Sequence, residues 1–86
     1  MTETAVIERV QALVIGIAGP DRTPPAVGPD TPLVHGGFWL DSVSLLEVVI
    51  ACEVEFGVVF DSATDLTADA FDSVRSLGRL IARRRC

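Results

Sequence analysis

The residues best suited to chemistry are Asp41 and Ser42, a carboxylate and a hydroxyl that are adjacent in the chain. Both residue types also cap helix N-termini through their side-chain oxygens, so the pair alone specifies little. We interpret the single histidine, His35, as a solvated loop residue, and neither Cys52 nor Cys86 has an adjacent base that would mark a nucleophile. Because the chain offers no acid–base pair, no metal site and no oxyanion arrangement, we expect it not to be an enzyme.

The composition indicates a single small domain. The chain has 86 residues, of which 49% are hydrophobic, and this suits one core. Its two cysteines are poorly placed for a disulfide framework, which favours a reducing, cytoplasmic compartment. Residues 1–8 carry acids where a signal peptide would be basic. The longest uncharged stretch, residues 10–20, is shorter than the roughly 20 apolar residues of a membrane span, so we expect no membrane association.

Charge is strongly segregated along the chain. The net charge is −5, residues 30–72 contain nine acids and neither Lys nor Arg, and five of the seven arginines lie between Arg75 and Arg85. This pattern argues against nucleic-acid binding, which needs a basic footprint. It favours partners with basic docking surfaces, although the acids could also serve solubility alone. The arginines are most simply a solvated helix end, well placed against the C-terminal helix dipole.

Apolar periodicity predicts an all-α fold, a four-helix bundle with a long first loop, in a single domain of residues 1–86. The helices are expected at about 3–18, 42–56, 63–69 and 73–84, and the first loop at 19–40 contains all five prolines. Gly57 ends the second helix. Ser62 and Asp65 are spaced as a capping box for a short third helix, and Ser73 or Asp72 caps the fourth. Residues 58–60 are interpreted as a buried loop.

The predicted second helix has two distinct faces. The core stripe consists of Leu45, Val49, Cys52 and Phe56. A second face is contiguous with Ser42, is both apolar and acidic, and is called the docking face here; its members are Val43, Leu46, Glu47, Ile50, Glu53 and Val54. A helix that is apolar on two sides is normally buried all round. Unpaired carboxylates are rarely buried, however, so we interpret this face as a surface for partner proteins.

Several short motifs occur in a fixed order from residue 30 to the end of the last predicted helix. They are Asp30-Thr31-Pro32-Leu33, Leu40-Asp41-Ser42-Val43, Glu47, Glu53-Val54-Glu55-Phe56-Gly57-Val58, and Ser73-Val74 with Leu77, Leu80 and Ile81. Together they resemble the acyl carrier protein family: its D-x-x-L loop, its D-S-L modification motif, its E-x-E/F-G helix ending and its closing helix. The ordered set, in a chain of the family's length, is far more specific than the Asp-Ser pair.

The resemblance implies a carrier function. In this family the motif serine, here Ser42, bears a 4′-phosphopantetheine arm taken from coenzyme A, and its terminal thiol carries acyl groups as thioesters. Asp41 would be recognised by the phosphopantetheinyl transferase and lie near that enzyme's magnesium ion. A helix N-terminus suits the linkage, since its N–H groups and dipole favour a phosphate. Further partners would be acyl-loading enzymes, ketosynthases or other biosynthetic enzymes, and we expect a monomer.

Departures from the family pattern leave alternatives open. Val43 stands where the family usually has leucine, and the position of Val54 is often acidic in fatty-acid carriers, which favours a polyketide or related natural-product pathway, as in antibiotic biosynthesis, over primary fatty-acid synthesis. Gly36-Gly37 echo peptidyl or aryl carriers, so an aminoacyl or aryl carrier remains an alternative. A third is an unmodified helical interaction module in which Ser42 only caps a helix. Trp39 is either a core plug between loop and bundle or a wall that contacts the arm or its cargo.

Overall fold

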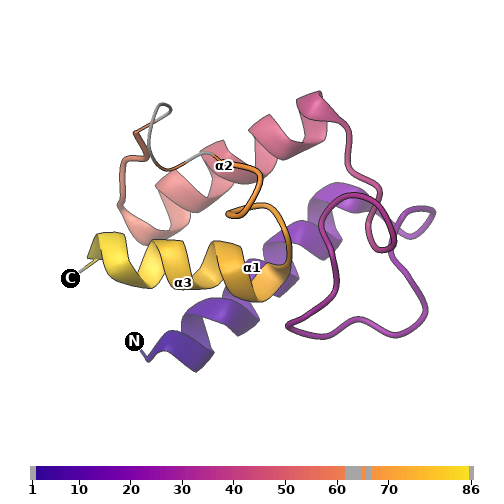
Figure 1. The fold of residues 1–86 in the computed structure, drawn as a ribbon, viewed down its shortest axis with the longest axis horizontal. Helices are drawn as coiled ribbons and strands as arrows, with labels where there is room; N and C mark the ends of the chain where they lie inside the picture. Colours follow the sequence, from indigo (N-terminus) through magenta and orange to yellow (C-terminus); the bar gives the residue numbers. More distant parts are fainter. Residues whose placement is uncertain (1, 62–64, 66, 86) are drawn as a thin grey trace.

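The computed structural model describes residues 2–61, 65 and 67–85. These residues form three helices and no strand: α1 (Glu3–Ala18), α2 (Ser42–Phe56) and α3 (Val74–Arg85). The all-α class is therefore correct. In Figure 1, α1 and α3 run side by side, α2 lies across the top, and the long loop between α1 and α2 forms one end of the molecule. α1 and α2 have the bounds that the periodicity predicts, and α3 begins and ends one residue later.

The prediction of four helices is wrong for the part of the chain that the structure describes. The short third helix was expected at 63–69, of which residues 63, 64 and 66, like the expected cap Ser62, lie outside the described residues. Residues 67–72 instead form successive turns, with Ala70 N–H donating to the Thr67 carbonyl at 3.1 Å. The Asp65 carboxylate accepts from Asp61 N–H at 2.8 Å. Asp and Thr side chains that bond to nearby backbone compete with helix formation, which explains the turns.

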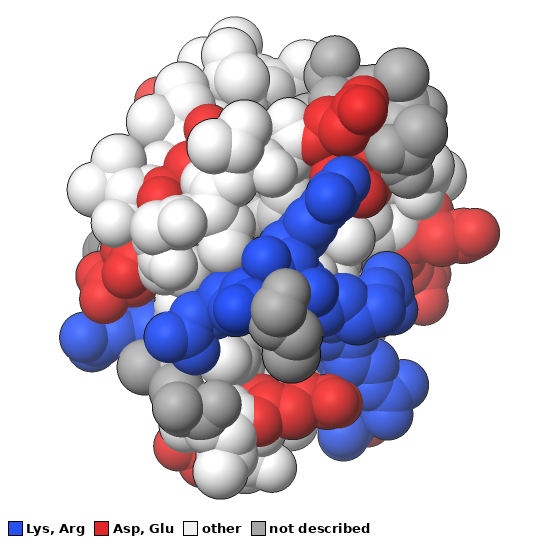
Figure 2. Space-filling view, turned by 90° about the vertical axis from the view of Figure 1, so that its left-hand side faces the viewer, with Lys and Arg blue, Asp and Glu red and all other residues white. Residues whose placement is uncertain are grey.

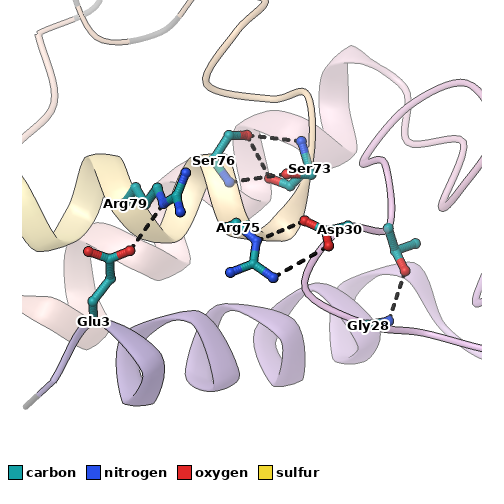
Figure 3. A network of polar contacts seen from close by, with 8 residues as sticks. Glu3, Gly28, Asp30, Ser73, Arg75, Ser76 and Arg79 are labelled. Atoms are coloured by element: carbon teal, nitrogen blue, oxygen red, sulfur yellow. Dashed lines mark hydrogen bonds and ion pairs between the residues drawn. The ribbon is translucent and has the colours of Figure 1, made fainter.

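The start of α3 is fixed by a reciprocal pair of serines. Ser76 N–H donates to the Ser73 hydroxyl at 3.1 Å, and Ser73 N–H donates to the Ser76 hydroxyl at 2.9 Å (Figure 3). This arrangement satisfies two backbone donors at a helix end, as a capping box does. Ser73, rather than Asp72, is therefore the cap. At the end of α2, Gly57 adopts a left-handed conformation with φ of 65°, as a helix-ending glycine does.

The core lies between the three helices and receives side chains from the loops. Its helical members from α1 and α3 include Val6, Ile7, Val10, Val14, Val74, Leu77, Leu80 and Ile81. α1 lies close to α3 at Gly78, where an added Cβ would lie 2.6 Å from Ile7 Cγ1. The absence of a side chain at position 78 thus allows the two helices to pack tightly.

The first loop is anchored to the start of α3. Arg75 N–H donates to the Pro29 carbonyl at 2.7 Å, and Val74 N–H donates to the Thr31 carbonyl at 3.2 Å. The Arg75 guanidinium also pairs with the Asp30 carboxylate at 2.8 Å (Figure 3). Leu33, at the end of the same segment, is fully buried. The D-x-x-L motif is thereby explained as the segment that joins the loop to the last helix.

Arginines cover the exposed side of α3 and gather around its C-terminal end (Figure 2). Arg79 pairs with Glu3 at 3.1 Å, and Arg84 pairs with Asp65. The Arg79–Glu3 pair is exposed, and an exposed pair contributes little stability on its own. Within the described ranges, no helix is long and apolar enough to cross a membrane.

Candidate functional site

The candidate site is the N-terminal end of α2. Asp41 is the N-cap, in extended conformation, and its Oδ1 accepts from Ser44 N–H at 2.8 Å, while its carbonyl accepts from Leu45 N–H at 2.9 Å. Ser42 is the first residue of the helix and its side chain is exposed. The first turn of a helix leaves backbone N–H groups without intrahelical partners. Ser42 thus presents a hydroxyl to solvent at a helix end suited to a negative group.

Asp41 is held in its charged form. The pKa of its carboxyl is lowered from the ordinary 3.8, first by the hydrogen bond from Ser44 N–H, then by the Ser44 side chain, and further by the positive charge of Arg22. Arg22 reaches this end of the helix from the first loop, and its Nη1 donates to the Ser44 hydroxyl at 3.0 Å. The site therefore combines a fixed carboxylate, a buried serine hydroxyl and a guanidinium group around the exposed Ser42.

The end of the first loop sets the direction in which the chain enters α2. Phe38 N–H donates to the Pro32 carbonyl and Leu40 N–H to the Leu33 carbonyl, both at 3.0 Å. The side chains of Leu33, Phe38 and Leu40 are buried. A Cβ at Gly37 would overlap the Pro32 carbonyl oxygen, so only glycine fits there. The glycine pair that resembled peptidyl carriers therefore has a structural reason in this loop, which the sequence alone did not reveal.

Trp39 is not a core plug. Its side chain is 60% exposed, and the buried aromatic of the pair is its neighbour Phe38. Its φ is 54°, in the left-handed region that bulky residues rarely adopt. His35 is exposed as expected, and its ring meets that of Trp39 edge to face, with 5.0 Å between centroids and an interplanar angle of 89°. An aromatic pair thus stands in solvent beside the start of α2.

The docking face is exposed as predicted, except at Glu53. Its four apolar members each leave more than half of the side chain exposed, and they are Val43, Leu46, Ile50 and Val54. Glu47 is exposed as well, but Glu53 is partly buried and its Oε2 accepts from Phe60 N–H at 3.0 Å. Glu53 therefore anchors the segment after α2, and the face is more apolar than the sequence indicates.

The segment after α2 is only partly buried. Val58 and Phe60 have buried side chains, as expected, whereas Val59 is 81% exposed. Burial thus alternates along these three residues. Val59 adds another exposed apolar side chain close in sequence to Val54, and the expectation that all three residues are buried is corrected at this position.

Cys52 belongs to the core stripe and is fully buried. Burial first, and then the charges of Glu55 and Glu53, raise the pKa of its thiol from 9.0 to about 12. A thiol with so high a pKa stays protonated and is a poor nucleophile. Among the described residues, no group of three or more His, Cys, Asp or Glu side chains is arranged to hold a metal ion.

A cleft of about 570 Å³ lies elsewhere, over α3 and the turns before it. It is lined mainly by charged side chains, among them Asp30, Asp69, Asp72, Arg75, Arg79 and Arg83.

Comparison of the chain with protein-family models, with curated proteins and with solved structures finds no match. A function for this protein must therefore be argued from its residues and their geometry.

Proposed function

We propose that this protein is an acyl carrier protein in which Ser42 is the attachment point for 4′-phosphopantetheine. The observation that carries the proposal is the exposed Ser42 hydroxyl at the first turn of α2, next to a capping aspartate and at the head of an exposed apolar helix face. No residue that the structure describes makes a hydrogen bond to this hydroxyl that would have to be broken before modification. Once attached, the arm supplies a thiol that carries acyl groups as thioesters.

Attachment consumes coenzyme A and is performed by a separate transferase with magnesium. The Ser42 oxygen forms a bond to the phosphorus next to pantetheine, the pyrophosphate bond of coenzyme A breaks, and adenosine 3′,5′-bisphosphate leaves. The hydroxyl proton passes to a base of the transferase. On this chain, the unpaired N–H groups of the first turn and the positive end of the helix dipole favour the phosphodiester that results. Asp41 holds that turn in place through Ser44 N–H.

The docking face supports the second half of the proposal, which is that partner enzymes bind along α2. Its exposed apolar side chains start at Val43, directly after Ser42, and continue to Val54 near the end of the helix. A contiguous exposed apolar surface on a small protein is a common sign of a binding site. Glu47 is the exposed acid of this face and would meet a basic side chain of the partner. The pathway that we favour is polyketide or related natural-product biosynthesis.

Mass spectrometry tests the attachment. The purified apo-protein is incubated with coenzyme A, magnesium and a phosphopantetheinyl transferase of broad specificity, and a gain of one phosphopantetheine is expected. Ser42→Ala should gain nothing. Thr4→Ala is the matched control, because it removes an exposed hydroxyl from the first turn of α1, and it should be modified as the unchanged protein is. No gain in the unchanged protein would favour an unmodified interaction module instead.

Two isoleucines allow a matched test of the docking face. Ile50 lies on this face, whereas Ile15 is exposed on α1. Ile50→Asp is expected to raise the KM of the transferase for the protein, and Glu47→Arg to do the same through its charge, while Ile15→Asp should leave the KM unchanged. Circular dichroism should show an unchanged fold in all three. Equal kinetics for Ile50→Asp and Ile15→Asp would refute the assignment of this face.

A further inference from the structure

The exposed Trp39 is unusual in three independent respects. Its side chain is 60% exposed although both neighbours, Phe38 and Leu40, are buried. Its backbone has a φ of 54°, which is unfavourable for a bulky residue and persists only where the surroundings enforce it. It is also the single tryptophan of the chain. Strained residues of this kind cluster at functional sites, so the position needs an explanation beyond packing.

The surrounding loop fixes the backbone at Trp39. The backbone N–H of Trp39 donates to the Val34 carbonyl at 3.0 Å, between the bonds that Phe38 and Leu40 make to Pro32 and Leu33. The ring of His35 contacts the Trp39 ring edge to face. A side chain that is already ordered loses little conformational entropy when a ligand covers it. Trp39 and His35 therefore form a pre-organised aromatic ledge in solvent.

The ledge lies within reach of anything attached to Ser42. Ser42 comes three positions after Trp39 in the chain, and three residues of extended chain span at most about 11 Å. A group tethered this close has a high effective concentration at the ring, so even a weak apolar contact becomes populated. The 570 Å³ cleft over α3 is unsuited to an apolar group because carboxylates and guanidinium groups line it.

We propose that Trp39, supported by His35, is the contact surface for the apolar chain of an acyl group carried on the arm at Ser42. This inference rests on the proposed carrier function. It implies a preference for acyl groups long enough to cover the indole, such as medium-length aliphatic chains, because only these remove a large apolar area from water. The cargo then packs on the outside of the protein at the head of α2.

Intrinsic fluorescence tests this directly, because the chain has one tryptophan and no tyrosine. The protein is loaded with the transferase from coenzyme A, acetyl-coenzyme A or octanoyl-coenzyme A, and mass spectrometry verifies each product. For the octanoyl form we expect a blue-shifted emission maximum and a quenching constant for acrylamide that is about twofold lower, since the chain can cover about half of the exposed indole. The acetyl and unacylated forms should match the apo-protein.

Variants separate contact with the ledge from other effects. His35→Ala keeps the fluorescent reporter but removes its support, so the octanoyl effect should shrink. Val59→Ala removes another exposed apolar side chain, in the segment after α2, and should leave the octanoyl effect intact. If octanoyl loading succeeds by mass and the quenching constant does not change, the inference about Trp39 is wrong while the carrier function stands. If no form gains mass, both the carrier function and the inference fail.

Discussion

Replacement of Gly78 by alanine is expected to destabilise the fold, although alanine is the better helix former. In a helix interior, alanine is favoured over glycine by about 1 kcal/mol. Against this gain, the new Cβ would lie 2.6 Å from Ile7 Cγ1 and 3.1 Å from Ile7 Cα, so α1 and α3 would have to separate. Overpacking of this kind costs about 1–3 kcal/mol. The net change should be a loss of up to about 2 kcal/mol in the free energy of unfolding.

Gly16 provides a matched control within α1. It is exposed and has no atom within 4 Å of an added Cβ. Gly16→Ala should therefore show the helix-propensity gain alone, about 1 kcal/mol, which raises the Tm of a domain of this size by roughly 4–8 °C. Urea unfolding followed by circular dichroism measures both variants, and equal m-values would show that stability alone has changed.

A double variant identifies the contact responsible. Ile7→Ala alone should cost about 2–5 kcal/mol because it empties a buried site. Combined with Gly78→Ala, it removes the atom that the new Cβ meets, so the double variant should be more stable than the sum of the single effects by on the order of 1 kcal/mol. If Gly78→Ala stabilised the protein as much as Gly16→Ala, the close packing of α1 on α3 would be refuted.

Three further outcomes follow from the loop, the core and the cap. Gly37→Ala should lower the free energy of unfolding by about 2 kcal/mol or more, because its Cβ would overlap the Pro32 carbonyl oxygen, and an unchanged thermal melt would contradict this. In a Cys86→Ser variant, the Cys52 thiol, with a pKa of about 12, should react with a disulfide reagent no faster than the protein unfolds. The contribution of this thiol to the free energy of unfolding should be fully present below pH 9.0 and should fall as the pH rises toward 12, because only the unfolded thiol ionises in that window. For Asp41, whose pKa is lowered, NMR titration of the carboxyl should give a midpoint below 3.8. The stability that the Asp41 carboxylate contributes should be present above pH 3.8 and lost as the pH falls through the folded pKa. This loss should be absent in Asp41→Asn.

Local signals made the helices predictable from the sequence. The apolar spacing of α1 and α3 and the glycine after α2 act within one or two turns of chain, so periodicity and capping rules identify them. The exposure of Ser42 and of most of the docking face follows from the positions of these side chains around the axis of α2, on the side away from the core stripe.

Contacts between distant residues were not predictable in the same way. Phe38 and Trp39 are adjacent aromatics, and the loop bonds to Pro32, Leu33 and Val34 decide which of them is buried. The sequence analysis assigned the Glu53 carboxylate to the docking face. Helix geometry alone does not show that the chain after α2 returns and brings the Phe60 N–H to this carboxylate. The expected third helix failed for a different, local reason, since among its described residues side-chain bonds to nearby backbone outweighed a weak helix propensity.

Charge is less separated in space than along the chain, and this leaves α2 as the acidic element of the molecule. Asp30 and Asp65 pair with arginines of α3, whereas α2 carries three glutamates and no arginine. In the field of a positively charged partner the molecule experiences a torque as well as an attraction, which turns α2 toward the partner before contact. Ions screen this alignment over about 8 Å at physiological salt, so rotation is guided only in the last steps of approach.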